Sequence, residues 1–190
     1  MVKNENAPFH KIHQGHPHSV ISDYPDRISD ECVRLTDAKV IPDVIDNVLD
    51  TVSFTAKFNG KQVTDGQHLR PSEAAEEPEI AMKGSEATFT LLMVDPDAPS
   101  PHDPKYRNWL HWMVVNIPGV DTQRGDVIVD YMGPSPLKGR HRYVLLLFKQ
   151  SGRMDARAPH ARQSFTVRDF ARGHGLGDPV AAQFFWAEPE

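Results

Sequence analysis

Two short apolar runs, each joined to a proline-containing loop, set the strongest limit on what this chain can fold into. Residues 89–94 (FTLLMV) lead into DPDAPSP, which holds three prolines, and YMGPSPLKGRHRY at 131–143 leads into VLLLFKQ. The loops cannot be regular helix or central strand, whereas runs that are apolar on both faces predict central strands. We predict that the two loops face each other and form one polar pocket.

Composition limits the class of protein. The 190 residues, 39% of them hydrophobic, suit one globular domain with a tail. The net charge is −5 and the basic residues are scattered, so direct nucleic-acid binding is not expected. The single cysteine, Cys32, excludes an internal disulfide and a cysteine-based zinc site. We expect no metal and no cofactor.

No apolar run approaches the length of a transmembrane helix, and residues 1–24 lack a signal-peptide core. We therefore expect a cytoplasmic protein, with the nucleus as a further compartment. Residues 1–24 are polar and contain four histidines at 10, 13, 16 and 18. A metal-binding tract is one interpretation. A flexible tail before a domain at 25–190 is favoured, because no carboxylate or cysteine is spaced to complete a site.

Hydrophobic periodicity predicts a mainly β fold. Apolar and polar residues alternate over residues 51–59, and Asn59-Gly60 then gives a strong hairpin-turn signal. Further strands are predicted at 61–63, 80–82, 89–94, 110–117, 127–131, 143–148 and 180–186, and helices at 30–40 and 166–173. Residues 69–79 are predicted to form a surface loop. Sixteen prolines between short elements favour this β-rich reading.

Alternation along the strand at 110–117 assigns its side chains to two faces. One face would carry Leu110, Trp112 and Val114, and the other His111, Met113, Val115 and Ile117. This places His111 among three apolar residues, where a histidine with satisfied hydrogen bonds in the core is the commoner outcome.

The polar residues near the strand ends form a candidate site. Asp95 and Asp97 are held by rigid prolines, and His141 has the same strand parity as Tyr143. Together with His111, they fit three kinds of site. A metal hydrolase could use them as ligands, although no His-Glu-x-x-His spacing is present. An Asp–His pair could act in general acid/base catalysis. A small anion pocket could use histidine, loop N–H groups and a tyrosine hydroxyl.

Three motifs in order resemble the phosphatidylethanolamine-binding protein family. DPDAPS at 95–100 resembles the D-P-D-x-P-S signature, and GRHR at 139–142 resembles G-x-H-R. WLHW at 109–112, followed by VNIPG, resembles the central strand. LRPS at 69–72 is similar to the plant branch that includes FLOWERING LOCUS T, TERMINAL FLOWER and MOTHER OF FT. YMGP at 131–134 is most similar to the MOTHER OF FT type.

The resemblance implies a large central antiparallel sheet packed on a smaller sheet, with peripheral helices near the C-terminus. It implies a non-enzymatic signalling regulator, of the flowering or germination type, whose pocket binds a phosphate-like anion or a phospholipid head group. The positions that match the lining of this pocket are Asp95, Pro96, Asp97, His111, Gly133, Pro136, His141 and Tyr143. We expect His141 to be the main anion donor, Asp95 to orient a histidine or to form a hydrogen bond with the ligand, His111 to form the floor and Tyr143 a wall.

The resemblance also implies protein partners. Arg70, Pro118 and Arg153 match positions that contact 14-3-3 proteins and through them bZIP transcription factors. Arg157 and Ala161 stand where florigen-type members carry aromatic residues, so activator-like flowering function is not expected. Two alternatives stay open: an interaction adaptor with a vestigial pocket, and a phosphoester hydrolase that uses the Asp/His set.

Overall fold

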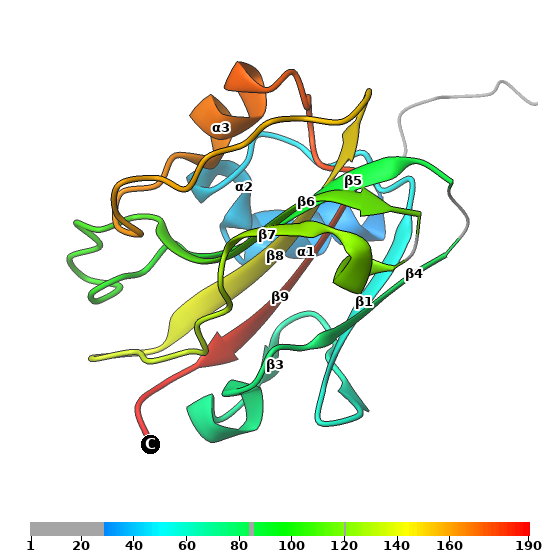
Figure 1. Ribbon diagram of the computed structural model, residues 1–190. Helices are drawn as coiled ribbons and strands as arrows, with labels where there is room; N and C mark the ends of the chain where they lie inside the picture. The colour runs from blue at the N-terminus through cyan, green and yellow to red at the C-terminus, as the bar shows by residue number, and fades with distance from the viewer. Residues whose placement is uncertain (1–28, 84–85, 120) are drawn as a thin grey trace, which may run out of the picture.

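The computed structural model describes residues 29–83, 86–119 and 121–190, and it has a mainly β architecture (Figure 1). The predicted His-rich tail at 1–24 lies outside the described residues. The strands are β1 (Ser53–Phe58), β2 (Lys61–Gln62), β3 (Gln67–His68), β4 (Glu79–Lys83), β5 (Thr88–Asp95), β6 (Trp109–Pro118), β7 (Asp126–Val129), β8 (His141–Gln150) and β9 (Ala181–Ala187). The helices are α1 (Asp30–Asp37), α2 (Val40–Asp43) and α3 (Val167–Gly173), with 3-10 turns η1 (Pro71–Ala74) and η2 (Thr122–Arg124).

The large sheet has six strands in the order β3-β9-β8-β5-β6-β7, and the small sheet has the order β2-β1-β4. All pairs are antiparallel except β3–β9, which is parallel. β5 and β8 pair along their length and every residue of 89–94 and 143–148 is buried. The prediction that these two apolar runs form central strands is confirmed, because both of their faces are covered.

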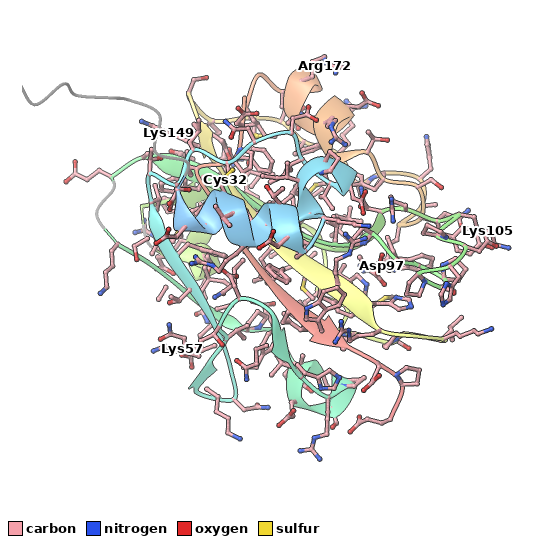
Figure 2. All side chains as sticks on the ribbon, turned by 180° about the vertical axis from the view of Figure 1, so that it is seen from behind. Cys32, Lys57, Asp97, Lys105, Lys149 and Arg172 are labelled. Atoms are coloured by element: carbon pink, nitrogen blue, oxygen red, sulfur yellow. The ribbon has the colours of Figure 1, made fainter. Side chains whose placement is uncertain are left out.

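The large sheet is the middle of three layers. On one face, Phe54 and Phe58 of β1 pack with Tyr143 and Phe185 of the large sheet. On the other face, the helical segments cover the sheet, and Figure 2 shows α1 lying across β8 and β9. The predicted large antiparallel sheet packed on a smaller one is therefore confirmed. Helices from both ends of the described chain, namely α1, α2 and α3, cover the other face of the large sheet.

Two local predictions differ from the structure, and one strand was not predicted. The helix predicted at 30–40 ends at Asp37, and Lys39 then takes a left-handed φ of 56° that turns the chain into α2. The predicted loop at 69–79 contains η1, whose Glu73 carboxylate accepts a hydrogen bond from the Arg70 backbone N–H at 2.9 Å. Strand β3 was not predicted, because two residues are too few to show a period.

Candidate functional site

A cavity of about 430 Å³ opens where β5, β6 and β8 meet their loops. The two loops predicted to face each other do meet here: a Cβ added to Gly139 would lie 3.0 Å from the Pro101 ring. Figure 2 shows Asp97 near the His141 end of β8, on the side of the molecule that carries the Lys105 loop. The lining residues are Asp95, Ala98, Pro99, Tyr106, Trp109, His111, Met132, Ser135, Leu137, His141, Tyr143 and Gln163.

Asp95 ends β5 and is 3% exposed. One carboxylate oxygen, Oδ1, accepts the Asp97 backbone N–H at 2.7 Å, which forms a local turn that stops the strand. The other, Oδ2, lies 2.7 Å from Nδ1 of His141. Both oxygens therefore act as acceptors inside the protein, and Asp95 contacts a histidine, which is one of the two roles expected for it.

His141 has an acceptor at each ring nitrogen. Nδ1 faces the Asp95 carboxylate, and Nε2 lies 3.0 Å from the Lys138 carbonyl oxygen. The Lys138 carbonyl oxygen can only accept, and the Asp95 carboxylate also accepts, so this arrangement favours a ring with hydrogen on both nitrogens. Burial opposes this charge, but the hydrogen bond and the negative charge of Asp95 outweigh it and raise the pKa of His141.

His111 reaches the cavity because β6 contains a bulge. The register pairs Met93 with Trp112 and Val94 with Leu110, so His111 is the extra residue on β6. Its ring packs edge-on against Tyr143, with centroids 5.2 Å apart. The predicted face assignment is therefore wrong for His111, since simple alternation cannot anticipate an inserted residue.

The same strand has a second departure from alternation. Leu110 packs in the helix-covered layer with Met113, whereas Ile117 packs with Trp112 on the opposite side. Asn116, which has a φ of 58°, precedes Ile117 and interrupts the regular pleat. The predicted face of Leu110 is wrong because of the bulge at His111, and that of Ile117 because of the break at Asn116.

The hydrogen bonds of His111 define its chemistry. Nδ1 lies 2.7 Å from the Met132 carbonyl oxygen, so Nδ1 carries the proton and Nε2 has a lone pair when the ring is neutral. Burial is the main cause that lowers the pKa of His111, and it outweighs the Met132 hydrogen bond and the charge of Asp95. The two histidines of the cavity thus have pKa values shifted in opposite directions.

Tyr143 lies between the two histidines and is fully buried. Its ring is nearly parallel to that of His141, at 17°, with centroids 6.4 Å apart. Burial, reinforced by the charge of Asp95, raises the pKa of Tyr143, so the hydroxyl keeps its proton. The Ser135 backbone N–H approaches this hydroxyl, but no hydrogen bond of normal geometry forms. Tyr143 thus lines the cavity with a hydroxyl that is buried and has no hydrogen-bond partner in the described part of the protein.

Asp97 faces away from the cavity and belongs to a buried ion-pair network. Its carboxylate accepts hydrogen bonds from the Arg142 guanidinium at 2.6 and 2.9 Å. Arg142 also donates to the carbonyl oxygens of Ala38 and Lys39 and pairs with Asp43 at 2.9 Å. The network ties the loop after β5 to the turn between α1 and α2, so Asp97 holds the frame of the cavity without lining it.

Three other predicted residues also lie behind the lining. The Pro96 carbonyl accepts a hydrogen bond from Arg107 Nε at 2.6 Å. Gly133 permits a close approach, because a Cβ there would lie 2.9 Å from the Ala74 carbonyl oxygen. Pro136 is buried within its loop. Of the eight predicted site residues, the structure thus brings Asp95, His111, His141 and Tyr143 to the cavity itself.

The residues proposed for partner contacts lie outside the cavity. The side chains of Arg70 and Arg153 are 65% and 77% exposed, and each pairs with a carboxylate, Glu73 and Asp126 respectively. Pro118 is partly exposed at the end of β6. Nothing in their geometry selects a partner.

The apolar wall of the cavity was not predicted. Tyr106, Trp109, Met132 and Leu137 line it alongside the polar residues. A signal was available in the sequence, because Leu137 is an isolated large hydrophobic residue in a loop of prolines and glycines. Within residues 29–83, 86–119 and 121–190, no group of three or more metal-binding side chains occurs, and no helix is long and apolar enough to cross a bilayer.

Comparison with known proteins agrees with the architecture. A family model described as "Phosphatidylethanolamine-binding protein" matches residues 55–185. Protein FLOWERING LOCUS T of Arabidopsis thaliana is 41% identical over 156 residues, which cover 80% of this chain and 89% of that protein. Protein MOTHER of FT and TFL1 homolog 2 of Oryza sativa subsp. japonica is 43% identical over 157 residues, which cover 80% and 90%. CEN-like protein 1 of Nicotiana tabacum gives the same identity and coverage.

Solved structures share the fold. A chain in the crystal structure of carboxypeptidase Y inhibitor complexed with the cognate proteinase superposes with a TM-score of 0.75 and 24% identity, over 84% of this chain and 95% of that chain. A phosphatidylethanolamine-binding protein from Plasmodium vivax gives a TM-score of 0.71 and 24% identity, over 84% and 97%. At this identity the likeness concerns the fold alone.

Proposed function

The chain belongs to the phosphatidylethanolamine-binding protein family, and from this premise we propose that it is a non-enzymatic regulator whose cavity binds a phosphate-like anion or a phospholipid head group. Its curated relatives include the plant proteins FLOWERING LOCUS T and MOTHER of FT and TFL1 homolog 2. We place its action in developmental signalling of the flowering or germination type, carried out through protein partners.

The observation that carries the proposal is the buried pair of Asp95 and His141. The carboxylate lies 2.7 Å from Nδ1 of His141 at the cavity wall, beside the buried hydroxyl of Tyr143. A polar ion pair without net charge and a hydroxyl group at the closed end of a cavity suit a small anionic head group. The geometry also revises the expected role of His141. Because both of its ring nitrogens already have acceptors, His141 would not donate directly to the anion, and its role would be to offset the negative charge of Asp95 beside the anion.

The same geometry argues against catalysis. Asp95 uses both oxygens as acceptors and His141 uses both nitrogens as donors, so neither is free to act as a general base. Of the ring nitrogens of His111 and His141, Nε2 of His111 is the one with a free lone pair. A hydrolase would still be indicated if the protein turned over a phosphoester and lost that activity in Asp95→Asn.

Phosphate titration by calorimetry tests the anion site. We expect His141→Ala to weaken phosphate binding by about tenfold or more, because it leaves the buried Asp95 carboxylate without its partner and so adds an uncompensated negative charge to the cavity. His102→Ala is the matched control, since His102 is exposed in the loop after β5 and does not line the cavity. Unchanged phosphate affinity in a folded His141→Ala protein would show that the anion site is elsewhere.

We propose that protein partners bind outside the cavity. The strongly exposed guanidinium groups of Arg70 and Arg153 are suited to a 14-3-3 surface, with Pro118 as a third contact, and bZIP transcription factors would then be reached indirectly. A 14-3-3 pull-down should lose the protein in Arg70→Ala and retain it in His141→Ala. If both variants bind as the natural protein does, this partner assignment fails.

A further inference from the structure

The cavity has two chemically different parts. Its closed end carries Asp95, His111, His141 and Tyr143, which are all 3% exposed or less. The remaining wall is largely apolar and is formed by Ala98, Pro99, Tyr106, Trp109, Met132 and Leu137. A volume of about 430 Å³ falls within the range of sites for small organic ligands. A bare phosphate ion would leave most of the apolar wall exposed to water.

Leu137 is the residue that most needs an explanation. The residue is 79% exposed, the largest value among the exposed large hydrophobic residues of the described chain, and Met132, at 38%, is another member of that set. Both line the same cavity. Exposed apolar area gathered beside a binding site is a mark of ligand contact, and covering it would add favourable free energy in proportion to the area buried.

The polar end attracts an anionic head group only weakly. Asp95 and His141 together contribute no net charge, and His111 is neutral by the direction of its pKa. The attraction for an anion is therefore modest, so the head group alone gives weak binding. Selectivity must come from the part of the ligand that touches the apolar wall.

We propose, on the basis of the anion-binding function above, that Leu137 and Met132 make the cavity select phosphate esters with an apolar body over free phosphate. The phosphate occupies the closed end near Tyr143 and His141. The body, an aromatic ring or a short acyl chain, lies along Trp109 and covers Leu137. Leu137 is thus a specificity-determining residue.

The proposal is tested by calorimetric titration of the full chain with inorganic phosphate, phenyl phosphate and dihexanoyl phosphatidic acid below its micelle concentration. We expect at least one ester to bind about tenfold or more tighter than phosphate, from the added apolar contact. Leu137→Asn should weaken ester binding at least about fivefold and leave phosphate binding unchanged. Because Leu137 is exposed, its replacement should not impair folding.

Val127→Asn is the matched control. Val127 is 52% exposed on β7 and does not line the cavity, so this variant should bind both esters as the natural protein does. Tighter binding of the phosphatidic acid than of phenyl phosphate would identify a lipid body, and the reverse an aromatic one. Both results support the proposal.

Two outcomes would overturn it, and they are distinguishable from failure of the anion site. If phosphate binds and neither ester binds more tightly, the selectivity inference is wrong while the anion site stands. The same holds if Leu137→Asn weakens phosphate and esters equally. If phosphate and both esters all fail to bind, the anion site and the inference fall together.

Discussion

Glu31→Gln should stabilise the protein at alkaline pH and have little effect at pH 5. Glu31 lies in the first turn of α1, and its Oε1 accepts the Ala182 backbone N–H at 2.8 Å, which satisfies the outer edge of β9. The carboxyl also forms a hydrogen bond with Asp50 and lies near the charge of Asp65. Burial is the main cause that raises the pKa of Glu31, from 4.5 to about 7, and the two aspartates add to it.

The direction of the effect follows from proton binding. The folded state holds the Glu31 proton more tightly than the unfolded state, so the associated stability is complete below the unfolded pKa of 4.5 and is lost as pH rises through about 7. The full difference corresponds to about 3 kcal/mol. Partial exposure and solvent screening reduce this to about 1–2 kcal/mol. Glutamine keeps the acceptor for Ala182 and a donor for Asp50 at every pH, which matches the protonated acid.

Urea unfolding at pH 5 and pH 8 measures this effect. The free energy of unfolding of Glu31→Gln minus that of the natural protein should increase by about 1–2 kcal/mol between the two pH values. Asp30→Asn is the control, because Asp30 shares the first turn of α1 but is exposed. A difference that is the same at both pH values, or a pH effect of equal size in Asp30→Asn, would refute the reasoning.

Three further predictions concern the cavity, its frame and the turn that precedes β7. In the natural protein, sulfate binding should strengthen by up to about tenfold per pH unit of acidification if His111 takes up one proton. His111→Asn should flatten this pH dependence. Sulfate has no proton to titrate in this range, so an unchanged slope in His111→Asn would exclude His111 as the titrating group. Arg142→Met should lower the free energy of unfolding by about 3–5 kcal/mol in urea, because it leaves the buried Asp97 carboxylate without its main partner; a loss below about 1 kcal/mol would contradict this. Gly125→Ala should cost about 1–3 kcal/mol, since its Cβ would lie 2.6 Å from a β6 side chain, whereas Gly152→Ala, with no atom within 4 Å, should be neutral in the same measurement.

The arrangement of the sheets could be predicted from local patterns, but the directions in which individual side chains point could not. Runs that are apolar on both faces identified β5 and β8, since two-sided burial leaves a composition signal. His111 was assigned to the wrong face because alternation assumes one residue per pleat. The bulge exists only in the pairing of β6 with β5, and pairing is a property of two segments together.

The same limit explains Asp97. Two aspartates separated by one proline suggested a joint role in the pocket, yet Asp95 binds His141 and Asp97 binds Arg142. Neighbouring residues on β8 point to opposite faces, so His141 and Arg142 draw the two carboxylates to opposite sides of the sheet. The positions of His141 and Arg142 in β8 predict that they lie on opposite faces. This separates the roles of the two aspartates only when it is known which residue each aspartate binds.

The charges of the described cavity residues indicate how a ligand must be accommodated. Asp95 and His141 cancel, and His111 is neutral, so a dianion would enter a site with no net positive charge. Two changes can compensate: His111 can take up a proton at Nε2, or the ligand can gain affinity from the apolar wall. The first makes anion binding depend on pH, whereas the second makes it depend on Leu137. Because the two contributions arise from different parts of the cavity, His111→Asn and Leu137→Asn should have additive effects on the binding of phenyl phosphate.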